Sequence, residues 1–411
     1  MSPTEALSPE SADLSIEKFL NINKDPDWLK EKRINAWKKY LNESLPDRVK
    51  HLWRYSDPVD FEINNREINH ERISLTFSQE EELAKNNIIF SELSPELLSN
   101  NDNLGKSLGK LTSEKPYRIT FLNDVLWSGG YCLYVPSGVK LDKPLVVQCS
   151  QFQKNKYHAL RMLIILEEGA EISLIDEIGS GSSEKIFSNV LMEVFLSKKS
   201  KLHYVNIQTL DKDATHHFCQ KAVLGERSEL SNLIVALGGK MSKADLSTQL
   251  SGHGSIVSTY GIVLGDSIQK FDHHTSIEHI APETKSSLDF RVVLKDKARS
   301  AYTGNLKINN EAAKSDAHQE NRNLLLSDNA KAESMPELEI LTNDVVRCNH
   351  GVTVGQVDKE QIYYLMSRGL KQKDAEKLIV EGFLEPTIFK IPQDSLREKI
   401  VEEIHSKLEN I

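Results

Sequence analysis

The chain has 411 residues, 39% of them hydrophobic and 27% charged, and its 60 acidic and 51 basic side chains give a net charge of −9. This length predicts two or three domains, or one elongated domain, and the composition is that of a folded globular protein. The acidic excess argues against nucleic acid and against an anionic membrane surface as partners.

Membrane, targeting and cysteine patterns in the sequence exclude further classes of protein. No apolar run reaches the roughly 20 residues that span a bilayer, and the N-terminal run MSPTEALSPESADLS lacks a basic segment followed by an apolar one, so we expect a cytoplasmic protein. The cysteines, Cys132, Cys149, Cys219 and Cys348, lie far apart without a CxxC motif, so neither a disulfide framework nor a zinc knuckle is indicated. Any site that uses Cys348 must recruit distant residues or another chain.

The N-terminal region, residues 1–115, is predicted to be helical or mixed. Residues 1–13 read as a loose end, and the runs SIEKFLNI and DWLKEKRINAWKKYLNESLP read as helices with apolar sides. Trp53 and Tyr55 are expected to dock this region onto the rest of the chain. LGKS at Leu104–Ser107 is similar to the end of a phosphate-binding loop, but Asn100 stands where that motif needs glycine. The chain is therefore expected to bind no nucleotide.

Residues 116–350 are predicted to form a β-helix, a stacked β-solenoid, and the chain as a whole to be mainly β. Short β-rich runs begin with YRITFLND at Tyr117, and small residues in charged turns introduce new strands. These small residues are Ala170, Ser200, Ser228, Gly254, Ala298 and Ala330, spaced by 30, 28, 26, 44 and 32 residues. The longest spacing contains an insertion-like stretch, His273–Pro282. Such a recurring unit indicates a solenoid, with a jelly roll or several β-sandwiches as the alternative.

A solenoid has two open ends, and terminal helices are their natural covers. The last region, residues 351–411, is predicted to be a helical domain that begins at Asp358, a candidate N-cap, and contains the helical runs KQKDAEKLIVEGFLEP and DSLREKIVEEIHSKLENI.

Two stretches contain metal-capable side chains. The run FDHHTSIEHIAPE contains Asp272, His273, His274, Glu278 and His279. In an extended strand His273 and His279 would share a side while His274 faces away, so the stretch fits structure or assembly as well as ligation. Whether these histidines or Cys219 take part in a site stays open.

The second stretch is Cys348-Asn349-His350, in a β-branched run whose alternation would point the thiol and the imidazole to the same side. This pair could be half of a metal or sulfur site, although a structural cysteine is also consistent with the spacing. No Ser-His-Asp order, HExxH motif or pair of catalytic carboxylates stands out, so we expect no enzyme and no catalytic residue.

The run AAKSDAHQENRNLLLSDNAKAESMPELEILTNDVVRCNHGVTVGQVD, with IYYLMSRGL, AEKLIVEGF and SIEHIAPETKSSLDFRVVLKDKARSAYTGNLKI, closely resembles the SufB/SufD scaffold family of iron-sulfur cluster assembly. The dense match covers about residues 255–385. The CxHG pattern at Cys348–Gly351 is most like the SufD subunit, because SufB-type chains carry Glu-His-Glu there.

The resemblance implies a β-helix between helical regions, a complex with a SufB-type subunit and an ABC ATPase of the SufC type, and an iron-sulfur cluster formed transiently near the subunit interface. It assigns His350, with Cys348 as its neighbour, to the metal and cluster site. It also makes Tyr364, Leu365, Arg368 and Gly369 candidate contacts for the ATPase.

Other readings stay open. The chain could be a purely architectural subunit that recruits SufC without contributing a ligand, or a SufB-like scaffold that pairs with itself. A polysaccharide-active β-helix enzyme is disfavoured, because no row of exposed catalytic groups is visible. The cluster type and the source of iron and sulfur cannot be read from the residues.

Overall fold

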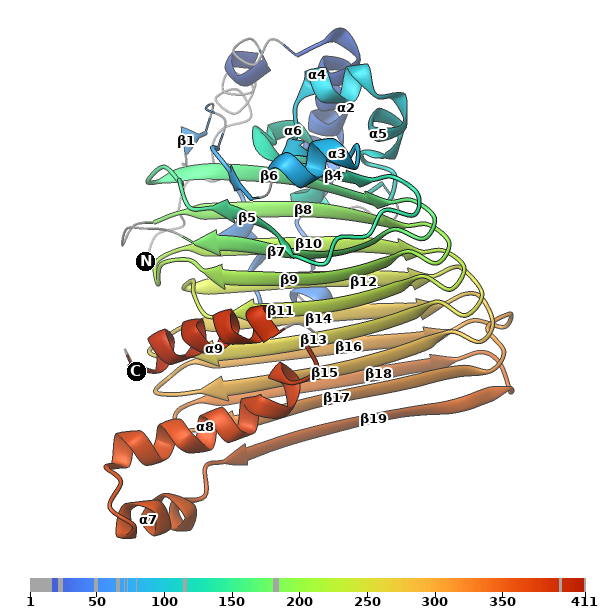
Figure 1. The fold of residues 1–411 in the computed structure, drawn as a ribbon. Helices are drawn as coiled ribbons and strands as arrows, with labels where there is room; N and C mark the ends of the chain where they lie inside the picture. Colours follow the sequence, from blue (N-terminus) through green and yellow to red (C-terminus); the bar gives the residue numbers. More distant parts are fainter. Residues whose placement is uncertain are drawn as a thin grey trace.

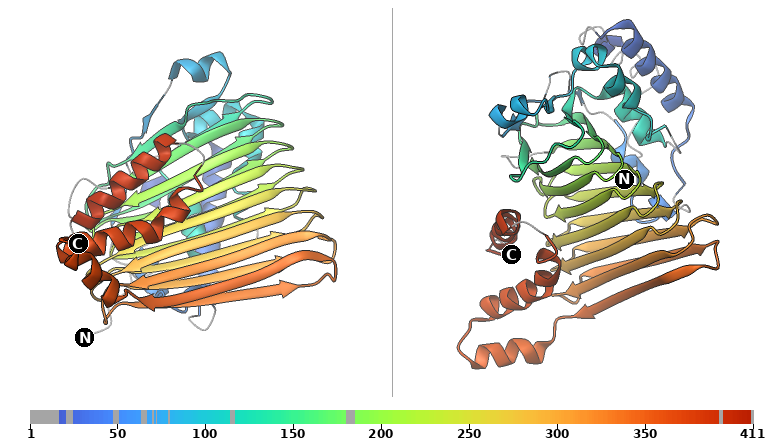
Figure 2. Two further views of the ribbon diagram at one scale, coloured as in Figure 1. Left: turned by 60° about the horizontal axis from the view of Figure 1, so that its bottom comes forward. Right: turned by 45° about the vertical axis from the view of Figure 1, so that its right-hand side comes forward.

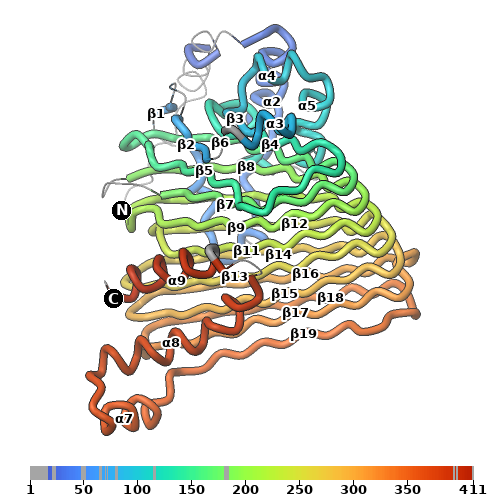
Figure 3. The backbone as a smooth tube through the Cα atoms, viewed as in Figure 1, coloured from blue at the N-terminus to red at the C-terminus, as the bar shows by residue number. Residues whose placement is uncertain are grey.

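The computed structural model describes residues 17–20, 25–47, 51–63, 67–69, 71, 73–78, 80–113, 117–179, 185–391 and 394–409. Strands alternate between two facing sheets, and each strand of the stack pairs in parallel with the strand two places later in the chain (Figure 1). The backbone trace shows the coils stacked one upon another, with β19 in the last coil (Figure 3). The predicted mainly β solenoid is confirmed. The loose end predicted for residues 1–13 lies outside the described residues.

The first sheet, sheet A, has the order β18-β16-β14-β12-β10-β8-β6-β4-β3, with β1 beside β6. Its strands are β1 (Glu67–Ile68), β3 (Ile89–Glu92), β4 (Gly129–Val135), β6 (Lys156–Leu166), β8 (Phe187–Leu196), β10 (Thr215–Leu224), β12 (Met241–Leu250), β14 (Lys270–His279), β16 (Arg299–Ile308) and β18 (Lys331–Ile340).

The second sheet, sheet B, has the order β19-β17-β15-β13-β11-β9-β7-β5-β2. Its strands are β2 (Thr76–Phe77), β5 (Leu145–Cys149), β7 (Glu171–Gly179), β9 (Lys201–Thr209), β11 (Glu229–Ala236), β13 (Ile256–Gly265), β15 (Lys285–Leu294), β17 (Ser315–Leu325) and β19 (Val345–Gln356). The antiparallel pairs β3–β4 and β2–β5 lie at the N-terminal end of the stack.

The sequence repeat comes from the turns between the sheets. Lys199 and Arg227 have positive φ angles of 56° and 52°, and each is followed by a buried serine. The hydroxyls of Ser200 and Ser228 donate to the carbonyl three residues earlier, which closes the turn. A small residue recurs because neighbouring coils are only about 4.8 Å apart.

The 44-residue spacing between Gly254 and Ala298 does not result from an insertion. Gly254 lies in a turn that leads into sheet B, whereas Ala298 lies in a turn that leads into sheet A, so this step covers one and a half coils. The stretch His273–Pro282 contains most of β14, which is in continuous register with β12 and β16. The expectation of an insertion is therefore wrong.

The space between the sheets changes character along the stack. In the first coils it is filled by aliphatic side chains such as Leu133, Ile164 and Val194, all fully buried. In the last coils amides replace them: Gln319, Asn321 and Asn323 are buried and bonded to one another or to neighbouring backbone and hydroxyl groups. The interior is thus apolar near the N-terminal end and polar near the other end.

The helices of the N-terminal region lie at the N-terminal end of the stack and along the outer face of sheet A. They are α2 (Asp27–Asn42), η1 (His51–Trp53), η2 (Pro58–Phe61), α3 (Glu80–Lys85), α4 (Pro95–Asn100), α5 (Asp102–Ser107) and α6 (Arg118–Leu126). Leu104–Ser107, the LGKS run, lies within α5 rather than in a loop after a strand, so it forms no phosphate-binding loop.

The run YRITFLND, expected to be the first strand, is instead helix α6. Thr120 accepts a hydrogen bond from the backbone N–H of Tyr117 at the helix start. Asn123 donates to the carbonyls of Leu160 and Asn189, which fixes the helix on sheet A. Because α6 is buried on nearly every side between α2 and the sheet, its helical periodicity is hidden in the sequence.

Residues 51–61, which we call the strap, run across the outer face of sheet A as far as its last strand. Ser56 donates to Asp272, and the guanidinium of Arg54 lies 3.6 Å from the sulfur of Met335 on β18. The buried Lys243 donates to the carbonyl of Leu52 at 2.8 Å. The strap therefore fastens the N-terminal region along the outside of the stack, and the docking expected of Trp53 is present, since its side chain is buried.

The C-terminal helices are α7 (Lys359–Ser367), α8 (Gln372–Ile388) and α9 (Asp394–Glu409). Helices α8 and α9 lie on the outer face of sheet B and not over the last coil (Figure 2). Lys390 pairs with Asp289 at 2.7 Å, and Arg291 donates to the carbonyl of Phe383. The expectation that C-terminal helices cover the second open end is therefore wrong.

The division into regions at 115/116 and 350/351 stays a prediction, although β19 itself continues to Gln356. None of the described helices combines the length and the apolarity needed to cross a bilayer.

Candidate functional site

The C-terminal end of the solenoid is open. Among the described strands, β18 pairs only with β16 and β19 only with β17, so each has one edge that no described strand covers. On the inner faces of these two strands, apolar side chains that would be covered by a further coil are exposed: Leu338 (36%), Ile340 (43%), Val352 (36%) and Val354 (49%). The end of the stack thus combines free strand edges with an uncovered apolar layer, and both favour association.

Cys348 and His350 lie on β19 at this open end and share its inner face. Their register partners on β17 are Ala317 and Gln319, which are both buried in the interior of the stack. The intervening Asn349 faces outward, where its side-chain oxygen lies 2.7 Å from the imidazole of His318. The expectation that the thiol and the imidazole point to one side is met by this geometry.

An irregularity in the strand sets this orientation. Ser315 pairs with Val345, but the next residue of β17, Asp316, pairs with Arg347, so Val346 is the extra residue of a bulge. Val346 is 68% exposed. Side chains alternate between the two faces of a strand. One extra residue therefore reverses which of the following side chains face inward. If Val346 paired with Asp316 instead, Cys348 would lie opposite the outward-facing His318, and His350 would face outward with it.

The two side chains have different surroundings. Cys348 packs against a small apolar cluster that includes Leu306, Ile308 and Ala317, and this partial burial raises the pKa of its thiol. His350 is exposed, and the following Gly351 has no neighbouring atom within 4 Å of where a side chain would begin. The imidazole is therefore accessible, whereas the thiol is held in its protonated form until a metal or a base is supplied.

The pair is not a complete metal site by itself. In the part of the chain that the structure describes, no three or more His, Cys, Asp or Glu side chains gather closely enough to hold a metal ion. Iron coordinated by Cys348 and His350 would need further ligands from outside this chain.

The predicted contacts for an ATPase lie on or next to α7, which has no buried residue. Tyr364 is 57% exposed, and the guanidinium of Arg368 lies 5.1 Å from the centre of its ring. Gly369 has a φ of 99°, a conformation that favours glycine and ends the helix. Leu365 is half-buried beside them. With the neighbouring Tyr363 at 75% exposure, α7 presents an exposed aromatic surface.

The histidines of β14 do not converge. His273 and His279 face the interior and His274 faces outward, as the alternation predicted. Both ring nitrogens of His279 are bonded, to Thr284 at 2.7 Å and Ser286 at 2.8 Å. His274 bonds Asp272 at 2.8 Å beneath the strap. These residues therefore serve the packing of the stack and form no site together.

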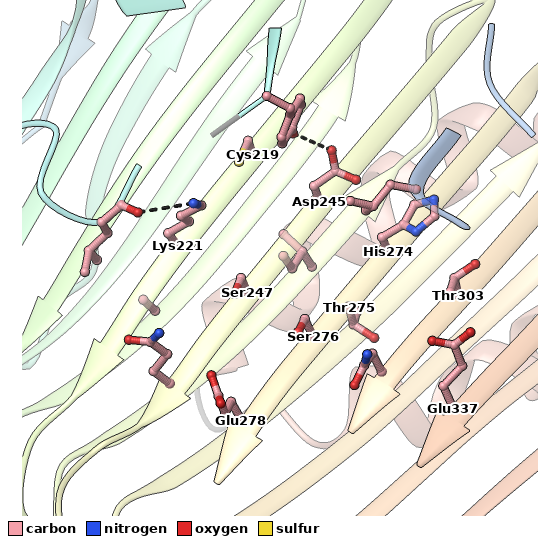
Figure 4. A pocket seen from close by; sticks show the side chains of 17 residues that line it. Cys219, Lys221, Asp245, Ser247, His274, Thr275, Ser276, Glu278, Thr303 and Glu337 are labelled. Atoms are coloured by element: carbon pink, nitrogen blue, oxygen red, sulfur yellow. Dashed lines mark hydrogen bonds between the residues drawn. The ribbon is translucent and has the colours of Figure 1, made fainter. Parts of the chain in front are cut away.

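Cys219 lies at a cavity of about 290 Å³ on the outer face of sheet A. Figure 4 shows it beside Asp245 and His274 on neighbouring strands. Burial raises the pKa of the Cys219 thiol to about 12, so it is a poor thiolate ligand. The buried Asp245 instead pairs with Lys243 at 2.9 Å and bonds the hydroxyl of Tyr117 at 2.6 Å.

Sequence reasoning missed the apolar inner layer and the bulge. The signal for the layer was present: the runs PELEI and VTV carry β-branched and aliphatic residues at alternate positions, as a covered strand would. The bulge had no such signal, because a single extra residue is visible only against a paired strand.

Together these features define a class: a β-solenoid protein that carries a thiol and an imidazole at its open end. The chain belongs to the family described as SUF system FeS cluster assembly, SufBD core domain, whose model matches residues 149–383.

Among curated proteins, the iron-sulfur cluster assembly protein SufD of Bacillus subtilis is 25% identical over 96% of this chain and 97% of its own length. An iron-sulfur cluster assembly SufBD family protein of Staphylococcus saprophyticus is 26% identical over 77% of this chain and 68% of its own. Within the family the chain is SufD-like, and the resemblance noted from the sequence is confirmed.

Proposed function

We propose that the chain is a non-catalytic, cytoplasmic scaffold subunit of iron-sulfur cluster assembly that pairs with a SufB-type subunit and binds a SufC-type ABC ATPase. The observation that carries this proposal is the open end of the solenoid. It combines free strand edges, an uncovered apolar layer and two metal-capable side chains on the inner face of one strand.

The open end supports a seam with a second subunit. A partner that adds a strand beside β18 or β19 would bond the free backbone groups and cover Leu338, Ile340, Val352 and Val354. Cys348 and His350 would then lie at the junction of the two chains. The cluster, as the cargo of the complex, would receive one part of its ligands from each side.

The two side chains would act at different moments. His350 is exposed and can bind iron through a ring nitrogen as soon as iron arrives. Cys348 carries a thiol whose pKa is raised by partial burial, so it would ligate only once the metal displaces its proton. The polar interior behind them, with Gln319 and Asn321, can hydrogen-bond to cluster sulfur.

The helix α7 supports a separate contact for the ATPase. Its aromatic residues and Arg368 are exposed on a helix held away from the sheets (Figure 2). Aromatic and arginine side chains dominate the energetics of protein interfaces. The nucleotide would be supplied there by the partner, since Leu104–Ser107 forms no phosphate-binding loop.

The cluster site is tested by anaerobic co-purification with the SufB-type and SufC-type proteins of the same source, followed by measurement of iron and sulfide per complex. We expect His350→Ala to leave the complex assembled and to abolish cluster recovery, because it removes the accessible ligand. His253→Ala is the matched control, since His253 is a half-exposed histidine in a middle coil that pairs with Glu283.

The outcomes separate the alternatives. Normal iron and sulfide with both His350→Ala and Cys348→Ala would leave the chain as an architectural subunit only. Recovery of a cluster from this chain and the ATPase alone, with two copies of this chain per complex, would make it a self-pairing scaffold.

The ATPase contact is tested by Arg368→Glu, which reverses a charge in the middle of the proposed surface. We expect the ATPase to be lost from the complex while the SufB-type subunit stays bound. Arg227→Glu, a reversal at an exposed turn of a middle coil, should retain both. Retention of the ATPase by Arg368→Glu would contradict this assignment.

A further inference from the structure

A row of cations lies at the N-terminal ends of four strands of sheet A, away from α7, and ends at Lys331 on β18. Lys270, Arg299 and Lys331 are direct register partners on β14, β16 and β18, and Lys240 immediately precedes Met241, the partner of Lys270 on β12. All four are exposed. In-register parallel strands place such residues about 4.8 Å apart, so the charges of Lys270, Arg299 and Lys331 are stacked coil upon coil, and Lys240 lies one residue before the next position of the stack.

This arrangement contrasts with the other lysines of the stack. At the opposite turns, exposed lysines alternate with glutamates of the next coil: Lys140 pairs with Glu171, Lys198 with Glu226 and Lys201 with Glu229. The four cations of the row make no ion pair or side-chain hydrogen bond with any residue that the structure describes. Like charges on directly opposite residues destabilise a sheet, so the row costs stability that nothing within the described chain offsets.

The acidic residues of the neighbouring turns are engaged elsewhere. Asp266 pairs with Lys407 on α9 at 2.9 Å, and Asp296 accepts a hydrogen bond from the backbone of Ser267 at 3.1 Å. Glu333, two residues after Lys331, hydrogen-bonds to the hydroxyl of Tyr55 in the strap. None of these carboxylates neutralises the row, although the net charge of the chain is −9.

The row continues into a groove of about 490 Å³. Lys240 and Lys270 line it together with Lys156 and Lys185 from earlier coils. Its wall also contains Ile268, an apolar side chain that is 62% exposed, and the two carboxylates of Asp60 and Asp213. The groove wall thus carries mostly positive side chains, but it also contains two carboxylates and one exposed apolar side chain.

We propose that this row and groove bind an acidic, extended segment of a protein partner. Carboxylates on alternate residues of an extended segment share one side, lie about 6.6 Å apart and can each approach a cation of the row. A continuous phosphate chain fits less well, because Asp60 and Asp213 would repel it and the whole protein is acidic. The surface includes neither Cys348 and His350 nor any residue of the ATPase contact, although Lys331 lies on β18 at the open end.

The test measures the fluorescence anisotropy of a labelled peptide that alternates glutamate and isoleucine, titrated with the full chain. Binding should weaken as salt rises, and the glutamine version of the peptide should not bind. The variant with Lys240→Glu, Lys270→Glu, Arg299→Glu and Lys331→Glu should weaken binding about tenfold or more. The control variant with Lys140→Glu, Lys198→Glu, Lys201→Glu and Lys314→Glu has the same net charge and should bind like the original chain.

Absence of peptide binding, equal binding by the two quadruple variants, or tighter binding of an oligothymidylate or of phosphatidylserine vesicles would overturn the proposal. A second measurement does not depend on any ligand or on the fold of the reversed variant. Arg299→Gln should raise the melting temperature, because it removes repulsion with both neighbours in the row. An unchanged or lower melting temperature would remove the observation on which the proposal depends.

Discussion

The two ends of the solenoid are built from the same repeating coil but are finished in opposite ways. At the N-terminal end, α2 and α6 cover the coils, the interior is aliphatic, and buried ions are paired. At the C-terminal end the inner layer is bare and the interior is polar. The covered end contributes the stability of the fold, and the open end provides a surface for which another chain is the natural cover.

The difference also explains why the free edges of β18 and β19 need not be a defect. Exposed strand edges invite uncontrolled pairing, and proteins interrupt them with charges, bulges or covers. Here Arg347 and its partner Asp316 lie on the outer side of the edge, and Val346 forms a bulge. The charge pair and the bulge therefore limit indiscriminate stacking at this edge.

We expect the largest difference between the two ends when an arginine is replaced and the free energy of unfolding is measured. Arg161, near the covered end, is 1% exposed and pairs with Asp124 at 2.6 Å and Glu193 at 2.8 Å. Arg161→Ala should lower the free energy of unfolding by about 3–5 kcal/mol, because it leaves buried carboxylates uncompensated. Arg347→Ala at the open end should lower it by only about 0–1 kcal/mol, since its pair is exposed. Urea unfolding of both variants measures the difference, and equal losses would contradict the contrast.

A second contrast uses aliphatic side chains. Leu122 in α6 is fully buried, and Leu122→Ala should cost about 2–5 kcal/mol in the free energy of unfolding. Val352, 36% exposed at the open end, should cost about 0.5 kcal/mol or less when replaced by alanine in the isolated chain. In the complex with the SufB-type subunit, however, Val352→Ala should weaken association. Calorimetric unfolding of the isolated chain and a binding titration separate the two effects, and a large loss in the isolated chain would mean that the end is already covered.

The coils between the two ends contain buried histidines that predict a pH dependence. Burial lowers the pKa of His216 to about 3 and that of His158, His273 and His279 to about 4. These pKa values are depressed in the folded state, so the folded protein holds the four histidines in their neutral form. Their contribution to the free energy of unfolding is fully present above about pH 6.5, the ordinary pKa of histidine, and is lost as the pH falls toward 4. Asp176 has the opposite effect. Burial raises its pKa to about 7, so its contribution to the free energy of unfolding is lost as the pH rises through 7.

Urea unfolding between pH 7 and pH 4.5 therefore should show falling stability. His273→Phe should flatten this slope by about one proton, because the ring stays packed against Phe271 and Phe290 but cannot titrate. Phe271→Leu, which changes the packing beside His273 without removing a titratable group, should leave the slope unchanged. Equal slopes for His273→Phe and the original chain would contradict the assignment of the buried histidine.

The smallest expected change in stability accompanies a large change in function. Inserting one alanine between Arg347 and Cys348 shifts the strand by one residue, so that Cys348 and His350 turn to the outer side of β19. Because the strand is at the edge, the isolated chain should lose only about 1 kcal/mol, while cluster recovery from the assembled complex should be abolished. Val346→Ala leaves the strand unshifted and should recover the cluster normally. Iron and sulfide contents compare the two, and equal recovery would show that the orientation does not matter.

Much of the fold could be predicted from the sequence because its causes are local and repeated. Small residues such as Ser200 and Ser228 recur where the backbone turns, and alternation predicted correctly which of His273 and His274 faces the interior. Features that depend on distant partners could not be predicted. Helix α6 is buried on almost all sides, so its pattern matched a strand, and the docking of α8 on sheet B depends on a contact between Lys390 and Asp289.

The candidate site was predicted in part. The pairing of Cys348 with His350 on one face followed from a period of two, but the choice of the inner face depends on the bulge at Val346, which is visible only against β17. That the end is open follows from where α8 and α9 pack, and this information is not local to the site.

The central claim is that the free edge of the last coil becomes a seam with the SufB-type subunit. Hydrogen exchange of Val345–Gln356, measured in the isolated chain and in the assembled complex, tests it most directly. We predict rapid exchange in the isolated chain of those amides that do not bond β17, and strong protection of the same amides in the complex. An assembled complex in which these amides exchange as fast as in the isolated chain would contradict the account.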